Sequence, residues 1–266
     1  MFLKFDAFIF KVSLHSDLVC SFFESLDYSL EATSPVSGYR YAYTLSRGGN
    51  AHGRVQWGGD NVGDDVYVNI MGSDSGLVRD AVIAAGWCCS LLRADIALDF
   101  DGEHYFDKLA SDLVAIAKKR ALKTSTVGDW IQKKEGRTLY VGSRTSVFMM
   151  RLYEKYKQKN IDTHGEKTVR LELEIKPVKT ARKKSFLLSP LDLVSSSRSF
   201  SEIYQKYFEL TDGLTMNQIK KESDHERALS HMIKQYQNTI KKQLEICNGS
   251  IYDLFQSLIE HKEWKD

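Results

Sequence analysis

The chain has 266 residues, 42% of them hydrophobic, and its 37 Lys and Arg against 35 Asp and Glu give a formal net charge of +2. This length and apolar content suffice for one large domain, or for a domain with a helical appendage. The apolar N-terminus is interrupted by charges and lacks a signal-peptide cleavage site, and no stretch approaches the roughly 18 uninterrupted apolar residues of a membrane span. We therefore expect a cytoplasmic protein without a membrane segment.

Several common kinds of site are excluded by their missing motifs. No G-x-x-x-x-G-K-[ST] and no G-x-G-x-x-G after a strand is present, which argues against P-loop hydrolysis, dinucleotide binding and ATP-driven helicase activity. The 7 histidines form neither H-x-H nor H-E-x-x-H, so a metal site must be led by carboxylates or recruit an isolated histidine. The 4 cysteines fit neither a disulfide framework nor a C-x-x-C zinc pattern, and we expect buried free thiols.

The N-terminal part of the chain is predicted to begin with a strand and a helix. Residues 6–14 alternate as a strand, and residues 15–27 are typical of a short helix with Ser16 as its N-cap. Three further strand-like runs follow at 39–46, 52–59 and 65–72, separated by two glycine-rich turns. This order predicts an antiparallel meander.

The remainder alternates helices and strands and then becomes helical. We expect helices over 75–87 and 104–120, and strands over 88–102, 138–142, 147–155 and 169–177. Beyond Pro190 the pattern is helical, most clearly over 225–245, where apolar residues recur every four positions. The sequence thus predicts an α+β fold, an antiparallel-rich sheet with covering helices. Its body spans 1–190, and a helical C-terminal region over 191–266 packs on it.

Positive charge is concentrated in the middle of the chain. Residues 118–184 contain 19 Lys and Arg against 7 Asp and Glu, whereas the rest contains 18 against 28. A basic surface of this kind supplies most non-specific nucleic-acid affinity, although a solvated charged face is an equally good explanation. Candidate DNA-binding cations in this segment are Lys133, Lys134, Arg137 and Arg144. Trp130, beside three of them, could stack an unpaired base.

Acidic side chains share one face of two predicted strands. The period-two rule places Asp95 and Asp99 together in the strand over 88–102, and Glu172 and Glu174 together in the strand over 169–177. Aspartate is disfavoured in strands, and a hard divalent cation with oxygen ligands would explain its presence there. An exposed sheet face with cross-strand ion pairs is the alternative, and for one strand alone we favour it.

A third strand combines a tyrosine with cations. Its period places Tyr153 on one face with Arg151 and Lys155. Neighbouring positive charge lowers the pKa of a phenol and stabilises the transition state of attack on phosphorus, which makes these three residues candidate catalytic groups. The chain has 13 tyrosines, so an ordinary strand aromatic beside a cation is the competing explanation.

Together these segments resemble the replication initiation factor family, which includes rolling-circle initiators of staphylococcal-type plasmids, filamentous-phage replication proteins and relaxases of some conjugative elements. The resemblance covers nearly the whole chain. It rests on the Asp6 strand, the Gly58-Gly59 turn, VNIMGSDSGLVRDAV, Arg93-x-Asp95-x-Ala97-x-Asp99, TLYVGSRTS, Arg151-x-Tyr153-Glu154-Lys155, Arg170-x-Glu172 and ALSHMIKQYQNTIKKQLE.

The resemblance implies an endonuclease that nicks one strand of origin DNA, single-stranded at the nick, in the cytoplasm of a bacterial host. Tyr153 would become linked to the 5′ phosphate and leave a 3′ hydroxyl for rolling-circle synthesis, with Tyr140 and Tyr156 as rival nucleophiles. Asp95, Asp99 and Glu172 become candidate ligands for Mg²⁺ or Mn²⁺.

Origin recognition is expected from the body, the basic middle or the C-terminal helices, and a host helicase and a second copy of the chain are candidate partners. Two other hypotheses remain, a catalytically inactive DNA-binding regulator and a metal-dependent nuclease that uses water.

Overall fold

The computed structural model describes residues 3–60, 62–158, 167–197, 201–207, 236 and 238–259. It divides the chain into two compact units, Met1–Thr215 and Met216–Asp266. In the second unit, residues 238–246 are helical and are followed by α8 (Ile251–Ile259). Much of the helix predicted over 225–245 lies outside the described residues.

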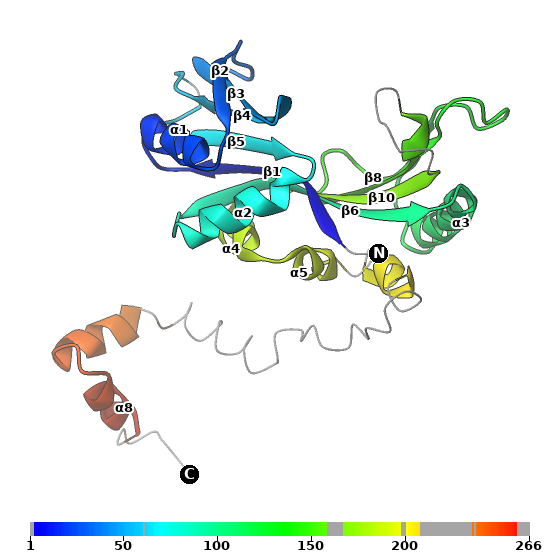
Figure 1. Ribbon diagram of the computed structural model, residues 1–266. Coiled ribbons are helices and arrows are strands. Elements are labelled where there is room, and N and C mark those ends of the chain that lie inside the picture. Colours follow the sequence, from blue (N-terminus) through cyan, green and yellow to red (C-terminus); the bar gives the residue numbers. More distant parts are fainter. Residues whose placement is uncertain are drawn as a thin grey trace. The chain divides into compact units, whose positions relative to one another are not determined.

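The first unit is built on one ten-stranded sheet with the order β2-β3-β4-β5-β1-β6-β10-β9-β8-β7, in which every neighbouring pair is antiparallel (Figure 1). The strands are β1 (Lys4–Val12), β2 (Ser29–Ala32), β3 (Tyr41–Arg47), β4 (Asn50–Trp57), β5 (Val66–Met71), β6 (Cys89–Asp101), β7 (Thr124–Val127), β8 (Thr138–Gly142), β9 (Phe148–Glu154) and β10 (Thr168–Ile175). The α+β prediction and the predicted meander, β3-β4-β5, are therefore confirmed.

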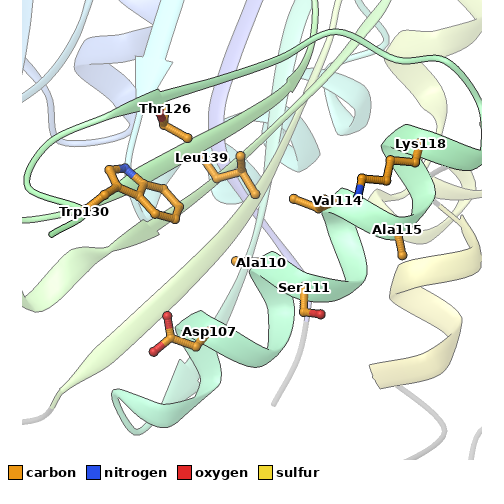
Figure 2. Close-up of a pocket in the computed structure, with 9 residues that line it drawn as sticks. All are labelled: Asp107, Ala110, Ser111, Val114, Ala115, Lys118, Thr126, Trp130 and Leu139. Carbon is orange, nitrogen blue, oxygen red and sulfur yellow. The ribbon is translucent and has the colours of Figure 1, made fainter.

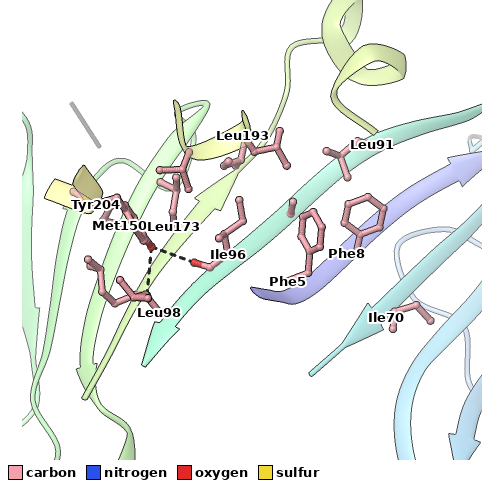
Figure 3. Close-up of a cluster of buried hydrophobic side chains, with 14 of the residues drawn as sticks. Phe5, Phe8, Ile70, Leu91, Ile96, Leu98, Met150, Leu173, Leu193 and Tyr204 are labelled. Atoms are coloured by element: carbon pink, nitrogen blue, oxygen red, sulfur yellow. Dashed lines mark hydrogen bonds between the residues drawn. The ribbon is translucent and has the colours of Figure 1, made fainter. Parts of the chain in front are cut away.

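Helices cover the apolar face of this sheet. They are α1 (Ser16–Ser25), α2 (Asp74–Ala84), α3 (His104–Lys119), α4 (Arg182–Leu187), α5 (Pro190–Ser195) and the helical residues 201–207. Figure 3 shows part of the hydrophobic core, which includes Phe8, Ile96 and Leu173. Tyr204, from residues 201–207, is fully buried there, and its hydroxyl donates to the carbonyl oxygens of Ile96 and Leu171 at 3.4 Å. Buried polar groups require such partners.

The compact first unit continues to Thr215, beyond the end of the body predicted at residue 190. Leu193 and Val194 of α5 and Tyr204 belong to the same hydrophobic core as the sheet. The packing of the rest of the C-terminal region on this body stays a prediction.

Some local features differ from those expected. The N-cap of α1 is His15, whose ring Nδ1 accepts from the Asp17 amide, so the Ser16 prediction is wrong by one residue. The short strands β2 and β7 were not predicted, because four residues give too little periodicity.

The cysteines are free thiols, as expected, but only Cys89 is buried. Among the described residues, no helix has the length and apolarity needed to cross a membrane.

Candidate active site

Antiparallel pairing brings the two acidic strand faces together at the centre of the sheet. In the register of β6 and β10, Asp99 lies opposite Arg170, and Asp95 lies opposite Glu174. Glu172 lies opposite the small Ala97, between these two pairs. Directly opposed residues on one face are close enough to interact. The three predicted metal ligands therefore share one face, which is opposite to the face covered by helices.

Asp99 is surrounded by cations. Arg170 donates to both of its carboxylate oxygens, at 2.6 Å and 2.8 Å, while Lys4 Nζ lies at 2.9 Å and Lys155 Nζ at 3.4 Å. Burial alone would raise the pKa of Asp99, but the hydrogen bonds from Arg170 and Lys4 and the charge of Lys155 lower it well below its usual range. This carboxylate is already neutralised by the protein.

Asp95 and Glu172 are more deeply buried than Asp99, and each is paired with one arginine. Asp95 is 3% exposed and accepts two hydrogen bonds from Arg93, at 2.7 Å and 2.5 Å, and Glu172 is 2% exposed and is paired with Arg151. Burial raises the pKa of both carboxyls, and the charge of Asp95 adds to the effect at Glu172, whose pKa rises to about 7. A bound cation would stabilise the charged forms of these two carboxyls, which burial disfavours.

The donor set fits a divalent cation with few protein ligands. Within the described part of the chain, no three Asp, Glu, His or Cys side chains are grouped closely enough to hold a metal as they stand. Mg²⁺ usually keeps several waters and takes only one or two carboxylates, which Asp95 and Glu172 could supply. The observed ion pairs are those of the alternative hypothesis for these strands, in which cations of the same face neutralise the acids.

Tyr153 lies against the same acids. In β9 it is opposite Arg170, and its hydroxyl donates to Glu172 Oε2 at 3.2 Å. The Arg151 guanidinium lies 5.1 Å from the centre of the Tyr153 ring. Burial, followed by the charge of Glu172, raises the pKa of the phenol despite the opposing effects of Arg170 and Arg151. The expected lowering of this pKa by neighbouring cations is therefore outweighed, because the side chain is only 5% exposed.

The two rival tyrosines have different surroundings. Tyr140, in β8, lies opposite Arg151 on the same face, is half-buried and contacts the exposed Arg144, whose guanidinium is 5.8 Å from the ring centre. Tyr156 follows β9 in the 3₁₀ turn η1 (Lys155–Lys157), and its hydroxyl lies 3.3 Å from Glu154. Glu154 points to the α3 side of the sheet, where it pairs with Arg137. Of the three tyrosines, only Tyr153 hydrogen-bonds to the acidic cluster, which consists of Asp95, Asp99, Glu172 and Glu174.

The four candidate DNA-binding cations differ in exposure. Lys133, Lys134 and Arg144 are exposed, and Lys133 Nζ lies 3.3 Å from Asp107. Arg137 instead is only 4% exposed: it pairs with Glu154 at 3.0 Å and with Asp107 at 2.7 Å. This guanidinium lies inside the fold and is therefore not among the proposed DNA contacts.

Trp130 also faces away from the acidic cluster. Its ring packs against Phe106 of α3 at 5.5 Å, and its Nε1 donates to the Val127 carbonyl at 3.1 Å. Figure 2 shows it at a pocket of about 490 Å³ between α3 and the strands β7 and β8, on the helix-covered side. Any base bound by Trp130 would therefore lie across the sheet from Tyr153.

Two features of the site were missed by the sequence interpretation. Lys4 and Asp6 of β1 reach it, since Arg170 contacts Asp6 and Lys4 contacts Asp99. The strand β7 adds a wall beside Tyr140. The β-branched run TSTV was the available signal for β7, but no local pattern indicates that β1 pairs with β6.

Fold and site together define an α+β protein with helices on one face of an antiparallel sheet and a tyrosine among paired acids and cations on the other. A family model described as replication initiation factor matches residues 89–258, more than half of the chain. The chain belongs to this replication initiation factor family.

The fold is also similar to the solved structure of a rolling circle replication initiator protein from Geobacillus stearothermophilus. The TM-score is 0.51 and the identity 16%, over 73% of this chain and 83% of that chain. At this identity the likeness concerns the fold. A comparison with curated proteins gives no match.

Proposed function

We propose that this replication initiator starts rolling-circle replication by nicking and rejoining one strand of origin DNA through Tyr153. The observation that supports it best is the contact of the Tyr153 hydroxyl with Glu172, beside Arg151 and on the acidic face of the sheet. The family description and the fold of the Geobacillus protein agree with this role. Origin DNA is the proposed partner, and a host helicase and a second copy of the chain stay predictions.

The proposed reaction is a transfer of one phosphodiester bond. The Tyr153 oxygen attacks the scissile phosphorus, its proton passes to the Glu172 carboxylate, and the bond from phosphorus to the 3′ oxygen breaks. The 3′ oxygen takes up a proton and leaves as a hydroxyl, while the 5′ phosphate stays on Tyr153. Rejoining is the reverse reaction. Glu172 Oε2 already accepts the hydrogen bond of this phenol at 3.2 Å, so it is placed to take up the proton while the other carboxylate oxygen is left for a cation.

Arg151 has two roles in this proposal. Its guanidinium lies over the Tyr153 ring, and the phenol is nearly buried. A scissile phosphate that draws Arg151 toward itself would also uncover the nucleophile, and the guanidinium would then offset the charge that develops on the phosphate. Lys155, bound to Asp99, is proposed as a positioning residue.

We propose Asp95 and Glu172 as the residues that hold Mg²⁺ or Mn²⁺, with Asp99 as the organiser of the cations around them. A bound divalent cation would supply positive charge that stabilises the reacting phosphate and favours the phenolate. Asp99 differs because Arg170, Lys4 and Lys155 already balance its charge.

One observation favours a second candidate, the metal-dependent nuclease that uses water. Tyr153 is 5% exposed and the pKa of its phenol is raised, and both features oppose a direct attack by the side chain. Water activated at the same carboxylates would cut DNA without a covalent intermediate.

The test is incubation of the protein with Mn²⁺ and single-stranded DNA from its own genetic element, followed by a denaturing gel and mass spectrometry. We expect a protein–DNA adduct on Tyr153, and no adduct with Tyr153→Phe. Tyr140→Phe and Tyr156→Phe are the matched controls and should retain the adduct. An adduct on Tyr140 or Tyr156 overturns the residue assignment, and cleavage without an adduct supports the water-using nuclease. Binding without cleavage indicates an inactive DNA-binding regulator.

A further inference from the structure

A small open pocket lies next to the acidic cluster on the same face of the sheet. Its volume is about 310 Å³, and its lining includes Lys123, Ser125, Val127, Tyr140, Arg144 and Met149. In the register, Tyr140 lies opposite Arg151, and Met149 lies opposite both Gly142 and Glu174. The pocket therefore adjoins Arg151, which lies opposite Tyr140 in β9. Glu172 lies one strand further on, in β10.

The pocket combines an aromatic ring with unpaired positive charge. Within the described part of the chain, neither Lys123 nor Arg144 forms an ion pair, unlike the cations around the acidic cluster. The Arg144 guanidinium lies 5.8 Å from the centre of the half-buried Tyr140 ring, and Val127 is an exposed apolar side chain at the rim. A flat apolar surface flanked by free cations suits a nucleobase and its phosphate.

The backbone around the pocket is held in place. Gly142 has φ +102°, and a Cβ there would lie 2.9 Å from the Phe148 carbonyl oxygen, so another residue would be strained at this position. The turn that bears Arg144 is fixed by Lys176, whose Nζ donates to the Arg144 carbonyl at 2.7 Å, and by Ser146, whose hydroxyl donates to the Ser143 carbonyl at 2.6 Å. Binding here would need little ordering of the backbone, which favours affinity.

We propose that this pocket binds one unpaired nucleotide of the strand that is cut, next to the scissile phosphate. The base stacks on Tyr140, and Arg144 and Lys123 contact the adjoining phosphates. The proposal rests on the proposed function, since it places this strand across β8 and β9. It also assigns Tyr140 a binding role through its ring, rather than a nucleophilic role through its hydroxyl.

The experiment measures binding of a fluorescent oligothymidylate of about 12 nucleotides, bearing one 2-aminopurine, in buffer with EDTA so that no strand is cut. Tyr140→Leu should weaken binding about tenfold, because the base no longer has an aromatic ring to stack on, and should relieve the quenching of 2-aminopurine. Tyr140→Phe should bind within about twofold of the wild type, because the ring is kept. Tyr41→Leu is the matched control, since Tyr41 is an exposed tyrosine stacked on Trp57 outside the pocket.

Unchanged binding by folded Tyr140→Leu overturns the proposal, as does equal weakening by Tyr140→Phe. Val127→Glu provides a second test that leaves the core intact, because Val127 is exposed on the edge strand β7. Its added carboxylate should weaken binding, and unchanged binding also argues against the pocket. Binding that depends on Tyr140 without any nicking by the wild type would contradict only the proposed function. An adduct on Tyr153 with wild-type binding by Tyr140→Leu would contradict only the pocket.

Discussion

The Tyr153 hydroxyl donates a 3.2 Å hydrogen bond to one oxygen of Glu172, while Arg151 holds the other oxygen of the same carboxylate. The two residues lie 19 positions apart in neighbouring antiparallel strands. The register of β9 and β10 thus decides which tyrosine meets the acidic cluster.

Metal binding should depend on Asp95 and Glu172 and not on Asp99. In a thermal unfolding experiment, Mn²⁺ at about 100 times its dissociation constant should stabilise the wild type by about 3 kcal/mol. Asp95→Asn and Glu172→Gln should lose this stabilisation, since each removes a ligand. Asp99→Asn is the matched control from the same face and should keep it, with a lower melting temperature in the absence of metal. Loss of the Mn²⁺ response in Asp99→Asn alone would contradict the assignment.

The metal-free protein should become less stable as the pH rises. The folded protein raises the pKa of Glu172 from 4.5 to about 7, so between these values the folded state binds more protons than the unfolded state. By linkage, the free energy of unfolding falls through this window, by on the order of 3 kcal/mol for this group, and levels off above about pH 7. Urea unfolding in EDTA from pH 5 to 8 measures it. Glu172→Gln cannot titrate and should show a shallower decrease, whereas an equal slope in both proteins would refute the shift.

Arg137 should stabilise the fold rather than bind DNA. It forms a buried pair with Glu154, and removal of one partner leaves the other charge uncompensated. Arg137→Met should lower the free energy of unfolding by about 3 kcal/mol in urea titrations. Arg144→Met, at an exposed arginine, should leave the stability nearly unchanged. A stable Arg137→Met protein with weakened DNA binding would instead restore the DNA contact predicted from the sequence.

Lys134 and Arg144 should contribute to DNA binding through charge. Removing one cation that neutralises a phosphate of single-stranded DNA should reduce the slope of log K against log salt by about 0.7. Fluorescence anisotropy over a range of salt concentrations should show this reduction for Lys134→Ala and for Arg144→Ala. Lys206→Ala is the control, because this exposed lysine is paired with Asp112 of α3. A slope that falls equally for all three variants would show that the effect is general and not local.

The local order of elements could be predicted from the sequence because it depends on short-range periodicity. The meander, the long strand β6 and the helix α3 follow directly from alternating or helical apolar spacing. The common face of Asp95 and Asp99, and that of Arg151 and Tyr153, follow from the same rule. The elements β2 and β7 were missed because four-residue strands are stabilised by their neighbours and leave too short a pattern.

The partners of each charged side chain were decided only by the tertiary structure. Local sequence places Arg137 in a basic segment and Tyr153 beside cations, but strand pairing buries Arg137 against Glu154 and the Tyr153 phenol against Glu172. Burial then reverses the expected direction of the Tyr153 pKa, because desolvation outweighs the nearby positive charge. The sequence by itself determined the fold class and the faces of the strands. Strand register brings together residues that lie far apart in the chain. Together with burial, it decided which charged side chains remain available for DNA.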